Sequence, residues 1–178
     1  MEYNILKSID LNEKSIYKSF TERYFSKRYI LDVNGIKNND IMLLFHSNRI
    51  TLLCLAPSHF FFKRDDDYKL NFTIGKVDRL SNTVKGKGKK GGQMLTPHTA
   101  ICKVEWSDNT SFEIPAGMKG FLVEINEQLV KNPKLLKECP NSDGFIAIML
   151  SSISISDSLK KELLNHEEYL KIINSSCE

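Results

Sequence analysis

Short apolar runs separated by polar turns make up most of the chain between residues 41 and 150. The runs at 41–46 and 49–55 (IMLLFH and RITLLCL) are joined by Ser47-Asn48, and this arrangement predicts a β-hairpin. Pro57 ends the second run because it has no N–H to donate to a strand ladder. Further apolar or alternating runs predict strands at 68–74, 98–106, 110–114, 120–125 and 144–150. This pattern is typical of a mainly β, or α+β, protein.

Helical spacing occurs in two places. The segment near 127–138 is interrupted by Pro133, which predicts a short helix or two short turns. Near 157–173, residues recur at intervals of three and four, which predicts one C-terminal helix capped by Ser156 or Asp157. The recurring residues are Leu159, Leu163, His166, Leu170 and Ile173. On this face His166 is expected to be a core histidine and not a ligand.

The N-terminal residues differ from the rest of the chain. Residues 1–22 carry scattered apolar side chains, which predicts a partly ordered N-terminal extension before a single domain over residues 23–178. The start lacks the pattern of a signal peptide, and no apolar run approaches the ~20 residues that cross a bilayer. We therefore expect a soluble protein made in the cytosol, without membrane association. Its well-separated cysteines are expected to be free thiols: Cys54, Cys102, Cys139 and Cys177.

A lysine-rich loop, VKGKGKKGGQ, occupies residues 84–93. The formal net charge of +3 is too small for the whole protein to bind polyanions, so any basic site must be local. Residues 86–91 match G-x-G-x-x-G, but the residues that follow cannot open a helix, and no Gly-Lys-Ser/Thr ends the loop. Two interpretations stay open: a loop with solvated lysines, or a patch that docks an acidic protein face or a phosphate backbone.

Motifs for catalysis are missing from the sequence. It contains no H-E-x-x-H and no nucleophile elbow, and the paired carboxylates stand in no distinctive frame. His98 and Cys102, on one predicted strand, would be about 13 Å apart, too far to share a zinc ion. We expect no enzymatic activity, no cofactor and no metal site.

Four segments together resemble one family. ERYFSKRYILDV (22–33), FHSNRITLLCLAPSH (45–59), the V-x-G-K-x-K-x-G-x-Q-x-L run (84–95) and GFLVEINEQL followed by GFIAIML resemble the Simiate family, also called the actin-binding transcription modulator (Abitram) family. The resemblance extends over about residues 23–172. It implies binding of monomeric actin, an influence on actin assembly, and a nuclear role linked to transcription. The expected location is cytoplasmic and nuclear.

The C-terminal half also resembles the glycine-cleavage H protein. The matching residues include Gly120, Val123, Glu124, Asn126, Glu127, Leu129, Asn132, Pro133, Leu135, Glu138, Pro140, Gly144 and Phe145. This resemblance implies a barrel-sandwich hybrid, the lipoyl-like hammerhead fold. In that family the lipoylated lysine lies on a hairpin tip beyond a Val-Glu pair, here Val104-Glu105. Asp108 stands at about that position, and Lys103 and Lys119 lie off the tip, so no lipoylation is expected.

These observations favour a non-catalytic protein-interaction module. Its candidate contacts with monomeric actin or another acidic protein surface are Lys85, Lys87, Lys89 and Lys90, with Arg49 as a helper. One alternative is a lipoyl or acyl carrier that uses an unexpected lysine. The other is an RNA-associated module that binds through the lysine-rich loop.

Overall fold

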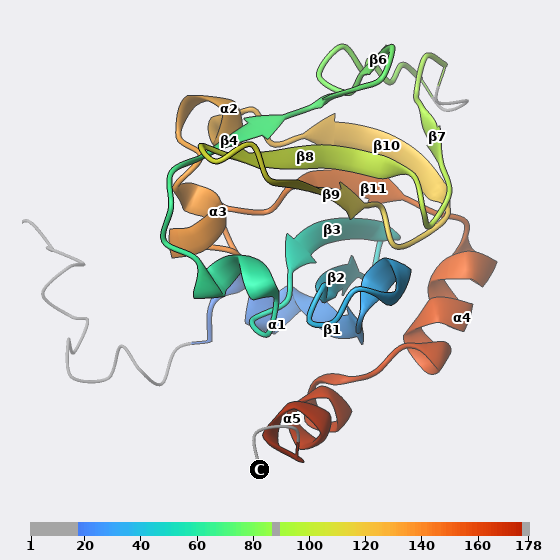
Figure 1. Ribbon diagram of the computed structural model, residues 1–178. Coiled ribbons are helices and arrows are strands. Elements are labelled where there is room, and N and C mark those ends of the chain that lie inside the picture. The colour runs from blue at the N-terminus through green and yellow to red at the C-terminus, as the bar shows by residue number, and fades with distance from the viewer. Residues whose placement is uncertain (1–17, 87–89, 176–178) are drawn as a thin grey trace, which may run out of the picture.

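A computed structural model describes residues 18–86 and 90–175, which form two stacked antiparallel sheets (Figure 1). The larger sheet has six strands in the order β1 (Phe25–Ile30), β2 (Ile41–His46), β3 (Ile50–Leu55), β11 (Ala147–Leu150), β10 (Gly120–Ile125) and β7 (Met94–Leu95). The smaller sheet has the order β4 (Tyr68–Asn71), β8 (Ala100–Trp106) and β9 (Ser111–Pro115). A separate two-stranded ribbon joins β5 (Thr73–Ile74) to β6 (Val77–Asp78). The mainly β prediction is confirmed.

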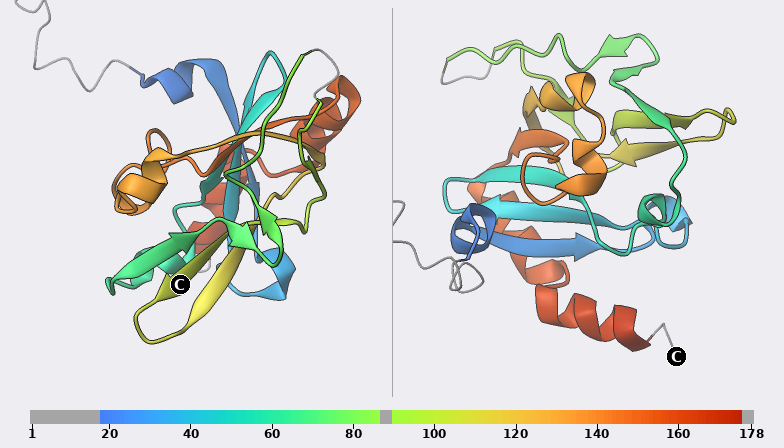
Figure 2. Two further views of the ribbon diagram at one scale, coloured as in Figure 1. Left: turned by 90° about the horizontal axis from the view of Figure 1, so that it is seen from above. Right: turned by 90° about the vertical axis from the view of Figure 1, so that its left-hand side faces the viewer.

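Helices cover the ends and one outer face of this sandwich. They are α1 (Phe20–Tyr24), α2 (Gln128–Lys131), α3 (Leu135–Glu138), α4 (Ile153–Glu162) and α5 (His166–Ser175), with short 3-10 turns η3 (Val33–Gly35) and η4 (Phe60–Lys63). Figures 1 and 2 show α2 and α3 at one end of the sandwich and α4 at the other. The two short helices at α2 and α3 agree with the prediction for the segment around Pro133.

The main core lies between the two sheets. Leu43 and Leu53 from the large sheet and Ile101 and Val104 from the small one are fully buried there. Alternation along β8 points one set of side chains into this core and the other toward solvent. Of the predicted strand at 68–74, Phe72 is buried but separates β4 from β5, so the run forms two short strands.

The β2–β3 hairpin is confirmed, but its turn is longer than predicted. Residues 47–49 form the loop, and the strand begins at Ile50, which pairs with Leu150 of β11, whereas Arg49 was expected to begin the strand. The N–H of Arg49 donates to the carbonyl of His46 at 3.2 Å, and Arg49 has a φ of 74°. This is the three-residue hairpin loop in which a turn is followed by a left-handed residue. Arg49 therefore occupies a position that usually favours glycine.

A second apolar cluster covers the opposite face of the large sheet. Met42, Leu44 and Cys54 point into it, and Tyr169 of α5 closes it. The rings of Tyr29 and Tyr169 are stacked, with centroids 3.9 Å apart. Because both faces of β2 are covered, its residues 41–45 are all buried, which explains an apolar run without alternation.

The helical prediction near 157–173 is confirmed, but the structure has two helices there in place of one continuous helix. The chain forms α4 and α5, and between them the carbonyl of Leu164 accepts a hydrogen bond from the N–H of Tyr29 on β1 at 3.0 Å. Asn165 then starts α5 with a capping box, because its side chain accepts from the N–H of Glu168 and its own N–H donates to the Glu168 carboxylate. The hydrogen bond from β1 to Leu164 and the cap at Asn165 together end α4 and start α5 as a separate helix.

Two smaller expectations for this region are wrong. The cap of α4 is Ser152, whose hydroxyl accepts from the N–H of Ile155, and not Ser156 or Asp157. His166 is exposed and not a core residue. Its Nδ1 lies 2.9 Å from the hydroxyl of Tyr29, so its partner comes from β1.

The N-terminal boundary stays a prediction. Ser19 and Glu22 form a capping box at the start of α1, and α1 runs directly into β1. The expected extension over residues 1–22 falls mostly on residues 1–17, which lie outside the described part of the chain. Of the cysteines, Cys54, Cys102 and Cys139 are free thiols, and Cys177 lies outside the described residues.

His59 is a buried histidine that holds a loop to the core. It is 1% exposed, its Nδ1 accepts from the N–H of Phe61 at 3.0 Å, and its Nε2 lies 3.0 Å from Oδ1 of Asn39. An accepting Nδ1 makes the ring neutral with its proton on Nε2, which donates to Asn39. Burial lowers the pKa of His59 from its ordinary value to about 4.

This buried histidine predicts a loss of stability in acid. The unfolded chain protonates His59 near pH 6.5, whereas the folded chain protonates it only near pH 4. The stability that neutral His59 contributes is therefore fully present above pH 6.5 and is lost as the pH falls toward 4. The free energy of unfolding should fall by about 3 kcal/mol over that window from this group alone. Urea titrations at about pH 7 and about pH 4.5 measure it. The difference in unfolding free energy between the two pH values should shrink in His59→Gln. It should persist in His98→Ala, which changes an exposed histidine. An equal difference in wild type and both variants would contradict the role given to His59.

Candidate functional site

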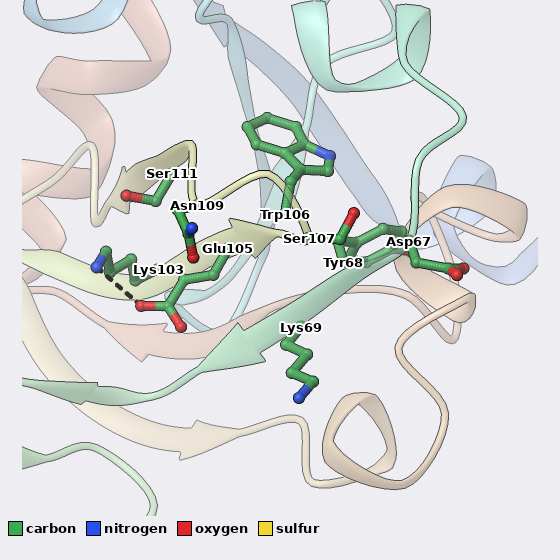
Figure 3. Close-up of a pocket in the computed structure, with 9 residues that line it drawn as sticks. All are labelled: Asp67, Tyr68, Lys69, Lys103, Glu105, Trp106, Ser107, Asn109 and Ser111. Atoms are coloured by element: carbon green, nitrogen blue, oxygen red, sulfur yellow. Dashed lines mark ion pairs between the residues drawn. The ribbon is translucent and has the colours of Figure 1, made fainter.

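The hairpin tip between β8 and β9 carries an aspartate. The turn spans residues 107–110, and Figure 3 shows two of its residues, Ser107 and Asn109, with Trp106 at the end of the preceding strand. Both the N–H and the hydroxyl of Thr110 donate to Oδ1 of Asp108, at 2.9 and 2.5 Å. The aspartate thus accepts hydrogen bonds from its own turn, as an Asx turn does.

Arg64 closes over this tip from a neighbouring loop. Its guanidinium forms ion pairs with Asp108 and Asp66, donates to the hydroxyl of Thr110 at 2.7 Å, and lies 4.4 Å from the Trp106 ring centre. The Thr110 hydroxyl, with help from Arg64, lowers the pKa of Asp108 to about 2. Lipoylation forms an amide with an amine, and this tip instead presents an ionised carboxylate paired with a guanidinium.

Beside the tip, the outer face of the small sheet forms an open polar cavity of about 500 Å³. Figure 3 shows the ammonium of Lys103 pointing to the carboxylate of Glu105, and their separation is 2.8 Å. Lys103, the lysine nearest to the tip in sequence on this strand, is therefore engaged on the sheet face. Lys119 lies just before β10, away from the tip.

The lysine-rich loop leaves the sandwich as a narrow hairpin. Lys85 and Lys90 face each other, and each N–H donates to the carbonyl of the other at 3.0 and 3.1 Å. Both side chains are exposed, and neither forms an ion pair with a described residue. Lys87 and Lys89 lie outside the described residues. Gly91 has a φ of 82°, and a Cβ there would meet the carbonyl oxygen of Thr83 at 2.5 Å, so only glycine fits this neck.

A buried polar network anchors the base of this hairpin to the large sheet. Arg79, 8% exposed, donates to the carbonyl of Ala100 at 3.2 Å and to the Gln93 side-chain oxygen at 2.6 Å. Asn82 accepts from the N–H of Gln93 and donates to the carbonyls of Leu122 and Val123 on β10. The glutamine in the V-x-G-K-x-K-x-G-x-Q-x-L run is therefore a structural residue. Arg79 and Asn82 were not predicted from the sequence, although the glutamine of this run, their shared partner, was visible in it.

Arg49 lies apart from the lysine hairpin in sequence and in its contacts. It occupies the β2–β3 turn and lines a second pocket of about 300 Å³ together with Lys119, Met94 and Phe121. No described contact joins it to Lys85 or Lys90. The structure thus places Arg49 at this pocket, and its role as a helper of the lysines stays a prediction.

No group of three or more metal-ligating side chains occurs within residues 18–86 and 90–175. The described histidines have separate partners: Asn48 for His46, Asn39 for His59, Asn34 for His98 and Tyr29 for His166. A search of the helices in the same residues found none long and apolar enough to span a membrane.

Comparison with known proteins identifies the family. The chain is 37% identical over 164 residues to Protein Abitram of Drosophila melanogaster, covering 91% of this chain and 73% of that protein. It is 35% identical to Protein Abitram of Xenopus tropicalis, with 93% and 92% covered, and 34% identical to that of Homo sapiens, with 89% and 88% covered. The chain belongs to the Abitram family. The two specific Abitram-like segments, SNRI and the lysine-rich run, are the β2–β3 turn and the hairpin with its buried base.

The chain also has an H-protein fold. The family model described as "Glycine cleavage H-protein" matches residues 54–176. A crystal structure of the glycine cleavage system H protein from Mycobacterium marinum aligns with a TM-score of 0.50 at 16% identity, covering 75% of this chain and 91% of that one. The lipoyl-like fold expected from the sequence is confirmed, and it carries Asp108 at its hairpin tip.

Proposed function

We propose that this chain is a non-catalytic interaction module that binds an acidic protein surface through its lysine hairpin. Monomeric actin is the first partner to test, because the family resemblance implies actin binding. A role linked to transcription, in cytoplasm and nucleus, belongs to the same proposal. The observation that carries it is the pair of exposed lysines Lys85 and Lys90, which face each other on a hairpin with an anchored base and form no ion pair with a described residue.

The physical role of such a hairpin is electrostatic. Lysines on a narrow projection create a local positive field in a chain whose formal net charge is only +3. Charges at the rim of an interface mainly raise the association rate and make it salt-dependent. The ionised Asp108 tip supports binding over carrier chemistry, because an aspartate cannot form the lipoyl amide.

The test compares two variants that each remove four positive charges. One replaces Lys85, Lys87, Lys89 and Lys90 with serine, and the control replaces the exposed Lys131, Lys134, Lys161 and Lys171. Anisotropy of labelled monomeric actin should show association slowed about tenfold at low salt by the hairpin variant, with a flatter salt dependence. The control should keep most of the wild-type rate and salt slope.

Two results would count against this proposal. Equal effects of the two variants would mean that net charge matters and the hairpin does not. No saturable binding at tens of micromolar, where contacts of ~6 kcal/mol still register, would remove actin as the partner. A titration with single-stranded RNA under the same conditions separates the RNA alternative, because phosphate binding should weaken steeply with salt.

A further inference from the structure

A small pocket opens at the end of the large sheet where several segments meet. It has a volume of about 300 Å³ and lies between the β2–β3 turn, β7, the start of β10 and the first turn of α4. Figures 1 and 2 show β7 and α4 at the same end of the sandwich as the base of the lysine hairpin. The side chains that matter for binding are Arg49, Met94, Lys119, Phe121, Leu150 and Ile155.

The pocket has an apolar character that reaches the molecular surface. Met94 is 54% exposed, and Ile153, next to Ser152 in the pocket wall, is 62% exposed. Phe121, Leu150 and Ile155 are half-buried around it. Exposed apolar groups gathered at one concave place are a feature of binding surfaces, because water contact there is unfavourable and a partner side chain can replace it.

The rim of the pocket is positively charged and uncompensated. Among the described residues, neither Arg49 nor Lys119 forms an ion pair, and no acidic side chain lines the pocket. The left-handed turn brings the backbone of Arg49 to the rim of the pocket. Both cations favour a carboxylate.

We propose that this pocket binds a short acidic segment of the partner protein, with one apolar side chain in the pocket and neighbouring carboxylates on Arg49 and Lys119. This inference rests on the proposed function and adds a pocket that retains the partner. Lysines on an exposed hairpin accelerate encounter, whereas residence time depends on an apolar group that is removed from water. The lysine hairpin therefore guides the acidic partner, and the pocket holds it.

Substitutions at the pocket should act on dissociation. The variants are Met94→Asp and the double variant Arg49→Asn with Lys119→Gln; asparagine tolerates the positive φ at position 49. In surface-bound actin kinetics, each should raise the dissociation rate about tenfold and change the association rate less than about threefold. Val130→Asp on α2, at the opposite end, is the matched control and should leave both rates unchanged.

A second measurement separates the pocket from the identity of the partner. A fluorescein-labelled peptide of aspartate and glutamate with one central leucine is titrated against the wild-type chain and against Met94→Asp, without actin. If actin fails to bind but the peptide binds wild type and loses at least tenfold in affinity with Met94→Asp, actin is the wrong partner and the pocket stands. If actin binds and the pocket variants dissociate at the wild-type rate, the pocket inference is overturned. The pocket inference is also overturned if a peptide with serine in place of leucine binds the wild-type chain as tightly as the leucine peptide does.

Discussion

Replacing Tyr169 with alanine should destabilise the protein by about 3–5 kcal/mol, the range for removing a buried aromatic ring. The ring is 2% exposed and stacks on Tyr29 at 3.9 Å. Its hydroxyl donates to the Ser58 hydroxyl at 2.9 Å and accepts from the Ser58 N–H at 3.0 Å, and Ser58 in turn donates to Asp40. The substitution opens a cavity under α5 and leaves the Ser58 N–H without its acceptor. Urea unfolding of the full chain measures the loss.

Two other variants separate the contributions at this site. Tyr169→Phe keeps the ring and removes the hydroxyl, so it should cost about 1–2 kcal/mol. Leu170→Ala, next to it on α5 and 42% exposed, should cost less than about 1 kcal/mol. If Tyr169→Ala costs no more than Leu170→Ala, then α5 does not stabilise the outer face of the sheet.

Replacing Gly144 with alanine should cost about 3 kcal/mol, at the upper end for overpacked sites. A Cβ at Gly144 would lie 2.1 Å from the carbonyl oxygen of Leu135 and 2.8 Å from that of Cys139. Both are backbone atoms of the α3 region, so no side chain can rotate away. The N–H of Gly144 also donates to the Cys139 carbonyl at 2.9 Å, which holds the glycine against α3. Thermal and urea unfolding should both show the loss.

The control for this glycine lies two residues away. Ser142 is exposed, and Ser142→Ala should change stability by less than about 0.5 kcal/mol. Hydrogen exchange should show faster opening of α3 and the following turn in Gly144→Ala and not in the control. Unchanged stability in Gly144→Ala would mean that the backbone of α3 moves away without cost.

The strands were predictable because each carries its pattern locally. Alternation in residues 102–106 and the continuous apolar run in residues 41–45 follow directly from which faces are buried. The split between α4 and α5 was less accessible, since it depends on a hydrogen bond between Leu164 and Tyr29, residues far apart in sequence. A local signal was nevertheless present: Asn165 followed three residues later by Glu168 is a capping-box pattern within the predicted helix.

The candidate site was predictable only in part. The lysines at 84–93 are visible in the sequence, but their presentation as a hairpin depends on Arg79, Asn82 and Gln93, whose partners lie on other segments. The contacts of Arg64 with Asp108 likewise join segments that are far apart in the sequence. In the sequence, residues 64–67 read as a charged loop; in the fold, Asp65 pairs with Lys137 of α3 and Arg64 crosses to the hairpin tip. Such pairs need the tertiary structure, because no spacing rule connects their positions.

The contact between Arg64 and Asp108 also restricts how the hairpin tip can change. A lysine at position 108 would place an ammonium group beside the guanidinium of Arg64, where like charges repel, and would remove the acceptor of Thr110. A single Asp108→Lys substitution would therefore place the new lysine next to a repelling guanidinium. Replacing Arg64 as well would remove this repulsion, although the two positions lie on opposite sides of β4–β8 in the sequence. The ion pair between Arg64 and Asp108 therefore disfavours a lysine at this hairpin tip.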